Sequence, residues 1–286
     1  MSVIIERDGP WALVTGATGG LGLQFCQLLA SRGYRLVITG RDAHRLARIR
    51  QEIPQAELAL AGDLTESVCL KNLLRHLKRD GIEPEVLINN AGYGLYGEAS
   101  NYTVEEHLNL IDLNIRALTA LTLELSKDMR KKHRGFILNV ASIAAFMPCP
   151  YLNVYGASKA YVLSFSEGLA EELKRDGVSV TALCPGPVKT GFWDRAGVTD
   201  AERFNYAITG ARDVAECGLK ALFAFKPVAV YGALNKALVL TAQLAPRFLV
   251  RLIAKRVLFS VGEKSSVVSK SNFKNAAKFC SSPVGK

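Results

Sequence analysis

The stretch Trp11-Ala-Leu-Val-Thr-Gly-Ala-Thr-Gly-Gly-Leu-Gly22 decides the fold of this chain. It begins with an apolar run that predicts a buried strand, and the apolar residues that follow it have helical spacing: Leu23, Phe25, Leu28 and Leu29. Between a strand and a helix, glycines let the backbone approach a pyrophosphate, and the helix N-terminus offers free N–H groups to it. The stretch therefore predicts a dinucleotide site, with a purely structural turn as the alternative.

Further apolar runs predict strands that alternate with helices through the next 210 or so residues. The strands are expected at 35–39, 58–60, 86–88, 136–140, 178–183 and 228–231. This alternation predicts an α/β fold, a doubly wound, Rossmann-like parallel sheet with helices on both faces in three layers. Ligands of such sheets bind beyond the carboxyl ends of the strands, and these residues fall there: Thr15, Asp63, Asn89, Ser142 and Pro185.

A tyrosine and a lysine stand four residues apart in Tyr155-Gly-Ala-Ser-Lys159, a stretch expected to be helical. Residues at this spacing project from the same helix face. We expect the Lys159 ammonium to lower the pKa of the Tyr155 phenol, so that the phenol can exchange a proton with a substrate oxygen near neutral pH. Taken alone, the pattern is more typical of a half-buried structural helix, and the other motifs of the chain decide between the two.

The cofactor preference follows from the end of the second predicted strand. An acidic residue there would bind the ribose 2′-OH of NAD, but this chain has Gly40 and then Arg41. A guanidinium suits a 2′-phosphate, so we expect NADP, in the form of NADPH for reduction. The alternative is that Arg41 only covers a solvated loop.

Together these motifs resemble the classical short-chain dehydrogenases/reductases (the SDR superfamily), from about residue 10 to about residue 195. The matching motifs are TGATGGLG (15–22), GR (40–41), DL (63–64), NNAG (89–92), Asn114, Ser142, YGASK (155–159) and PGPVKT (185–190).

The resemblance implies a role for each matching residue. Ser142 would hydrogen-bond the substrate carbonyl, Tyr155 would exchange its proton, and Lys159 would hold the nicotinamide ribose as well as tune Tyr155. Asn114 would anchor a water in the proton relay; otherwise it is a polar residue that bends its helix. The implied cofactor contacts are Gly16, Thr18, Gly20, Leu21, Gly22, Arg41, Asp63, Leu64, Asn90, Ala91, Gly92, Tyr155, Lys159, Pro185, Gly186, Val188 and Thr190. The resemblance further implies homodimers or homotetramers that pair through helices near 103–130 and 154–175.

The C-terminal part differs from the rest in charge. Residues 220–286 hold 12 Lys or Arg and only Glu263, whereas residues 1–219 are nearly neutral. We expect a dehydrogenase domain over 1–233, with a substrate lid at about 191–212, and a basic extension over 234–286. Within the extension, 246–259 predicts an amphipathic helix, which either lies on an anionic membrane surface or packs on protein. A disordered tail is expected after Gly262.

The cysteines and the N-terminus bear on metal binding and on location. The six cysteines show no metal-ligand spacing, so we expect no metal site. The N-terminus does not resemble a signal peptide, so we expect a cytoplasmic protein, which could also associate with a membrane surface. The basic residues are not arranged as a nucleic-acid motif.

The resemblance and the residues together predict an NADP(H)-dependent oxidoreductase that interconverts a carbonyl and a secondary alcohol. The aromatic residues Phe192 and Trp193 favour a lipophilic substrate, such as a steroid, a retinoid-like or a long-chain keto compound, and hence lipid metabolism. The alternatives are a 3-ketoacyl or small-ketone reductase and, from another class, a non-catalytic NADPH-binding sensor or scaffold.

Overall fold

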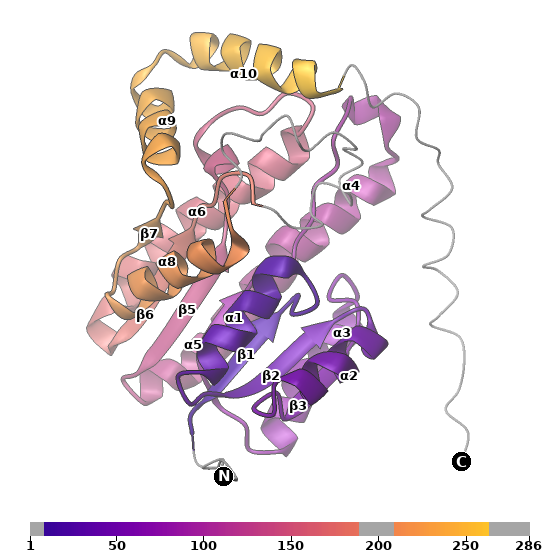
Figure 1. Ribbon diagram of the computed structural model, residues 1–286, viewed down its shortest axis with the longest axis vertical. Coiled ribbons are helices and arrows are strands. Elements are labelled where there is room, and N and C mark those ends of the chain that lie inside the picture. Colours follow the sequence, from indigo (N-terminus) through magenta and orange to yellow (C-terminus); the bar gives the residue numbers. More distant parts are fainter. Residues whose placement is uncertain (1–8, 189–208, 263–286) are drawn as a thin grey trace.

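The computed structural model describes residues 9–188 and 209–262. A seven-stranded parallel sheet, in the order β3-β2-β1-β4-β5-β6-β7, forms the centre of the molecule (Figure 1). Its strands are β1 (Trp11–Thr15), β2 (Arg35–Gly40), β3 (Leu58–Ala61), β4 (Pro84–Asn89), β5 (Gly135–Val140), β6 (Val178–Leu183) and β7 (Val228–Ala229). The order reverses direction between β1 and β4, which confirms the doubly wound α/β prediction.

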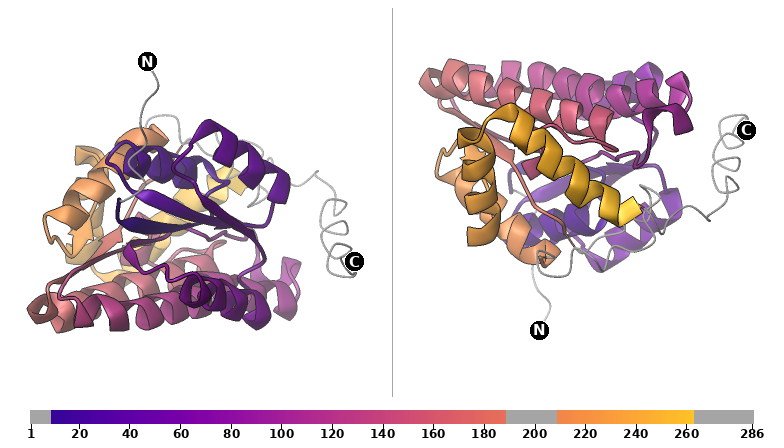
Figure 2. Two further views of the ribbon diagram at one scale, coloured as in Figure 1. Left: turned by 90° about the horizontal axis from the view of Figure 1, so that it is seen from below. Right: turned by 90° about the horizontal axis from the view of Figure 1, so that it is seen from above.

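Helices cover both faces of this sheet, as Figure 2 shows in its view from below. One face is covered by α1 (Gly20–Ala30), α2 (Ala43–Glu52) and α8 (Ala211–Phe223). The other is covered by α3 (Ser67–Arg79), α5 (Leu118–Lys131) and α6 (Asn153–Leu173).

Successive side chains along each central strand point into two different buried cores, one on each face of the sheet. In β1, Ala12 and Val14 pack under α1, whereas Leu13 packs with the helices of the opposite face. Both sides of each central strand are buried, which is why these strands are continuous apolar runs in the sequence.

The helix expected near 103–130 is interrupted where Asn114 lies. α4 (Val104–Ile111) passes into a π-helical turn (Asp112–Ala117) before α5 begins. The short β7 covers only the first half of the strand expected at 228–231. Of the lid expected over 191–212, residues 191–208 lie outside the described residues, and Ala211 and Arg212 already belong to α8.

Two more helices follow the sheet, α9 (Ala233–Leu244) and α10 (Arg247–Gly262). Seen from above in Figure 2, α10 crosses the molecule at the end where the strands terminate. None of the helices within the described residues is long and apolar enough to cross a membrane.

Candidate active site

One cavity of about 810 Å³ lies at the carboxyl ends of the strands. Of the predicted cofactor contacts, every one within the described residues lines it; Thr190 lies outside those residues. Segments that are up to 170 residues apart in the chain thus meet at one edge of the sheet, as the strand-end pattern predicts.

The glycine-rich turn forms one end of the cavity. Gly16 has a φ of +64°, and a Cβ on it would lie 2.9 Å from the Cα of Ala91. A Cβ on Gly22 would lie 2.2 Å from the carbonyl oxygen of Gly16. Both positions therefore require glycine, because the turn packs closely against the next loop. α1 starts at this turn with no capping side chain and no acidic residue in its first turn, an arrangement that suits an anion.

The loop after β4 is held to this turn by hydrogen bonds. The Asn90 side chain donates to the carbonyl oxygens of Thr15 and Gly16, both at 3.0 Å. The Thr15 hydroxyl accepts from the backbone N–H groups of Asn90 and Ala91, both at 3.0 Å. These contacts fix Asn90 and Ala91 against the turn, so they build the floor of the cavity.

The ends of β2 and β3 bring Arg41 and Asp63 to the same part of the cavity. The guanidinium of Arg41 lies 3.9 Å from the Asp63 carboxylate, and 64% of the Arg41 side chain is exposed. Asp63 also accepts hydrogen bonds from the backbone and hydroxyl of Thr65, at 3.0 and 2.9 Å. Asp63 is thus fixed, whereas Arg41 reaches into open space where an anionic group could lie.

α6 presents Tyr155 and Lys159 to the middle of the cavity, both nearly buried. The Lys159 ammonium lies 5.7 Å from the centre of the Tyr155 ring and donates a 2.7 Å hydrogen bond to the carbonyl oxygen of Val140, the last residue of β5. Ser142, two residues further, is hydrogen-bonded with Tyr155 and accepts from the N–H of Ala144 at 3.1 Å. The three residues therefore meet as predicted.

The pKa of the Tyr155 phenol differs from the predicted one. Burial raises the pKa of Tyr155 to about 12, although the hydrogen bond with Ser142 acts in the opposite direction. Burial also lowers the pKa of Lys159 to about 8. The net shift of the phenol pKa is therefore upward and not downward as predicted, because desolvation disfavours the charged form of Tyr155.

Asn114 lies behind this centre and does not line the cavity. It is fully buried, and its side-chain amide donates to the carbonyl oxygen of Tyr93 and to the hydroxyl of Ser158, both at 3.0 Å. Its Oδ1 accepts from the Tyr93 N–H at 3.2 Å. Asn114 thus ties the π-helical turn to α6 and to the loop after Gly92, and π-helical turns often occur at functional sites.

The loop after β6 closes the cavity from the other side. Pro185 accepts a 3.0 Å hydrogen bond from the N–H of Ile143, and Val188 forms a bridge to Thr209. A Cβ on Gly186 would lie 2.6 Å from both polar atoms of the Asn235 side chain. Asn235, buried on α9, lines the cavity and donates to the carbonyl oxygen of Tyr231 at 2.9 Å, and it was not predicted as a site residue.

α9 and α10 provide an apolar wall of the same cavity. Their lining residues include Leu238, Val250, Ala254 and Leu258, and the hydroxyl of Tyr96 donates to the carbonyl oxygen of Leu258. No motif marks these residues in the sequence; the only signal is the row of small and apolar residues on one helix face. The remaining wall comes from Tyr93, Met147, Cys149 and Leu152.

The cavity fits an elongated anionic dinucleotide at the glycine-rich end. The positions of Gly16 and Gly22, where a Cβ would collide, allow the backbone to come close to a pyrophosphate. A proton donor and a hydroxyl, Tyr155 and Ser142, line the same cavity as the apolar residues of α9 and α10. This arrangement is suited to proton exchange with a carbonyl or alcohol oxygen.

Comparison with known proteins points the same way. A family model described as short chain dehydrogenase matches residues 10–200. A Haemophilus influenzae protein named "Probable NADP-dependent dehydrogenase" is 37% identical over 176 residues, which cover 61% of this chain and 70% of that protein.

Two solved structures are similar over a larger share of the chain. The short-chain dehydrogenase from Sphingobium yanoikuyae in complex with NADPH has a TM-score of 0.72 and 30% identity, and covers 93% of this chain and 99% of its own. The bulky-bulky ketone specific alcohol dehydrogenase from Comamonas testosteroni has a TM-score of 0.69 and 26% identity, and covers 93% and 98%.

Proposed function

Because the chain belongs to the short-chain dehydrogenase family, we propose that it interconverts a carbonyl and a secondary alcohol with NADP(H), on a bulky lipophilic substrate. That it is an oxidoreductase of CH–OH groups using NAD(P)H follows from the family and its relatives. The proposal of a lipophilic substrate and of NADP(H) depends on one observation. Ser142, Tyr155 and Lys159 line the same cavity as the glycine-rich turn and an apolar wall.

The roles of the chain's own residues follow from their positions. The dinucleotide supplies the hydride when it is bound. Tyr155 gives its phenolic proton to the substrate oxygen during reduction, and Ser142 donates a hydrogen bond to the same oxygen as charge develops on it. Lys159, fixed by Val140, holds the ribose and provides positive charge next to Tyr155. Burial keeps the Tyr155 phenol protonated, which is the form that the reduction step uses.

The preference for NADPH rests on Arg41. Gly40 ends β2 with no acidic side chain in the position where a ribose 2′-OH would be bound, and the exposed Arg41 guanidinium follows it. A guanidinium can bind a phosphate through two parallel hydrogen bonds. The relative from Haemophilus influenzae carries NADP in its name, and the structure from Sphingobium yanoikuyae contains NADPH, which supports the same choice.

The substrate proposal rests on the wall that α9 and α10 contribute. Leu238, Val250, Ala254 and Leu258 give the cavity an apolar surface that the glycine-rich turn does not provide. The similarity to an alcohol dehydrogenase specific for bulky ketones, which covers 93% of this chain, supports a bulky ketone here. A steroid, a retinoid-like or a long-chain keto compound has this character, and a role in lipid metabolism would follow.

The quaternary structure is a separate part of the proposal. We propose a homodimer or homotetramer that pairs through α4, α5 and α6. Leu108, Leu123 and Tyr161 on these helices remain exposed in the monomer, and Tyr161 stacks on Phe165. Light scattering of the purified protein tests this point independently of activity.

The test of function is NADPH oxidation over a series of ketones graded from small to steroid-sized, with Tyr155→Phe as the control variant. We expect turnover that rises with the lipophilicity of the ketone and falls by a factor of about 100 or more in the variant. Turnover of small ketones or 3-ketoacyl compounds only would favour the alternative reductase. A third outcome is tight NADPH binding with neither reduction of any ketone nor NADP-dependent oxidation of any alcohol. It would favour the non-catalytic NADPH-binding sensor or scaffold.

A further inference from the structure

The outward surface of α9 and α10 concentrates exposed apolar side chains. Nine of the fifteen large apolar side chains that are exposed in the described part of the chain lie between Leu234 and Val257. They belong to two groups. Leu234, Leu238, Ile253 and Val257 line the cavity, so their accessible area faces it; Leu240, Leu244, Phe248, Leu249 and Leu252 do not line it.

Helical geometry explains this division. Val250, Ala254 and Leu258 follow each other at a spacing of four and face the cavity, and Val250 and Ala254 are buried. Phe248 and Leu252 form a second row on the opposite side of α10, since they are offset by two residues from the first row. α10 therefore packs on the protein with one face and leaves a second apolar row exposed. Of the two alternatives for 246–259, packing on protein accounts for the first face only.

Basic residues border the exposed apolar row. Arg251 and Lys255 lie one helical turn apart beside it, Arg256 lies on its other side, and all three are exposed. Within the described residues no acidic side chain forms an ion pair with them. From Cys217 to Gly262 the chain contains no Asp or Glu at all.

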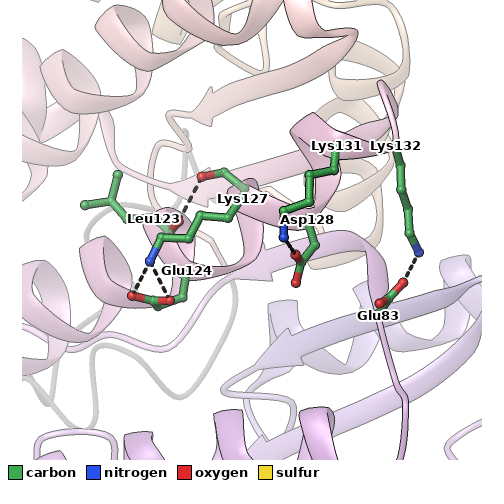
Figure 3. A network of polar contacts seen from close by, with 8 residues as sticks. Glu83, Leu123, Glu124, Lys127, Asp128, Lys131 and Lys132 are labelled. Atoms are coloured by element: carbon green, nitrogen blue, oxygen red, sulfur yellow. Dashed lines mark hydrogen bonds and ion pairs between the residues drawn. The ribbon is translucent and has the colours of Figure 1, made fainter.

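The end of α5 shows a different arrangement of surface lysines. There Lys127 pairs with Glu124, Lys131 pairs with Asp128, and Lys132 pairs with Glu83 (Figure 3). Lysines on α5 are thus neutralised within the chain. The positive charge of α10 has no such neutralising partner among the described residues.

We propose that this outward surface of α9 and α10, formed by Leu240, Leu244, Phe248, Leu249 and Leu252 with Arg251, Lys255 and Arg256, docks on an anionic lipid bilayer. Phe248 and Leu252 enter the boundary between headgroups and acyl chains, while the basic side chains reach the phosphates. Each Lys or Arg near such a surface adds to the binding.

A second copy of the chain fits this surface less well. A symmetric contact would bring the same patch of both copies together, and each patch carries positive charge with no acidic residue on the segment to balance it. Like charges facing each other across an interface disfavour association. An anionic bilayer complements both the charge and the apolar row.

Docking in this orientation has a consequence for the site. The helix that contacts the bilayer with Phe248 and Leu252 contacts the cavity with Val250 and Ala254 on its other side. A lipophilic ketone dissolved in the bilayer would then be concentrated beside the apolar wall of the cavity. This consequence rests on the proposed function, whereas the docking itself does not.

The test is flotation of the full-length protein with vesicles of phosphatidylcholine that contain about 30% phosphatidylserine, and with phosphatidylcholine alone. We expect binding to the anionic vesicles that weakens with salt. Phe248→Ser with Leu252→Ser, and separately Arg251→Glu with Lys255→Glu, should each weaken it at least tenfold.

Matched changes elsewhere serve as controls. Val68→Ser with Val104→Ser removes two exposed apolar side chains, and Lys71→Glu with Lys78→Glu makes the same charge change on α3. Both should leave vesicle binding unchanged, and unaltered NADPH affinity and thermal unfolding would show that every variant is folded. Equal binding by the α10 variants and wild type, or binding that ignores phosphatidylserine, would overturn the proposal. So would a dimer in solution that Phe248→Ser with Leu252→Ser dissociates, if vesicles are not bound.

Discussion

The guanidinium of Arg41 lies 3.9 Å from the carboxylate of Asp63, across the paired ends of β2 and β3. The two side chains are 64% and 36% exposed, and an ion pair at such exposure contributes little to stability. Asp63 is held by Thr65, so it fixes the region in which the Arg41 guanidinium moves. We therefore attribute the position of Arg41 to ligand binding.

Replacing Arg41 by alanine should separate the two cofactors. Arg41→Ala should raise the dissociation constant of NADPH at least tenfold, because a charge-assisted hydrogen bond to phosphate is lost, and change that of NADH by less than about threefold. Fluorescence titration with both nucleotides measures this. Arg45→Ala, a change of the same kind on α2 away from the cavity, is the control. Equal losses for both nucleotides after Arg41→Ala would contradict the NADP preference.

The stability of the protein should depend on pH through Lys159. Its pKa is about 8 when folded and has an ordinary value of 10.5, so between these values the unfolded chain binds more protons at this group. The contribution of Lys159 to the free energy of unfolding therefore rises with pH across this window, and below it the full cost of burying the ammonium is present.

Lys159→Met removes this term. The stability of wild type relative to Lys159→Met should thus increase, by an amount on the order of 3 kcal/mol, between pH 8 and 10.5. Urea unfolding at the two ends of the window measures the free energies of unfolding of both proteins. Most other titrating groups contribute equally to both proteins, so their contributions cancel in the difference. A difference that stays constant with pH would show that burial does not lower the Lys159 pKa.

The contact between Gly186 and Asn235 predicts a compensating pair of substitutions. Gly186→Ala places a Cβ 2.6 Å from the Asn235 amide, and should lower NADPH affinity and turnover about tenfold by displacing the loop after β6. Asn235→Ala alone loses the hydrogen bond to Tyr231 and should cost about 1 kcal/mol of stability.

The double variant should be more active than Gly186→Ala, because alanine at position 235 leaves space for the new methyl group. Steady-state kinetics of the three variants measures the interaction between the two sites. Gly168→Ala, where a Cβ would meet no atom within 4 Å, is the matched control and should be neutral. If the effects of the two substitutions simply add, the close contact does not constrain the site.

The sequence predicts the sheet and the cofactor end of the cavity well, because both depend on local signals. Apolar runs mark the strands, and close backbone contacts require glycine at Gly16 and Gly22. The protonation of Tyr155 and Lys159 could not be predicted, because it depends on burial by residues distant in sequence. The same holds for Asn235, whose role arises from its contact with a loop about fifty residues earlier.

The wall formed by α9 could not be predicted from the sequence either, because an apolar helix face does not show what it packs against. Leu238 lines the cavity on this helix, while Leu240, two residues on, does not. Leu238→Trp should therefore lower kcat/KM for steroid-sized ketones at least tenfold, the effect of a clash worth about 1.4 kcal/mol or more, and leave a small ketone within about threefold. Leu240→Trp adds the same side chain outside the cavity and should change neither value. Equal losses for both ketones after Leu238→Trp would place this wall at the cofactor, and unchanged values for both would show that α9 does not bound the substrate.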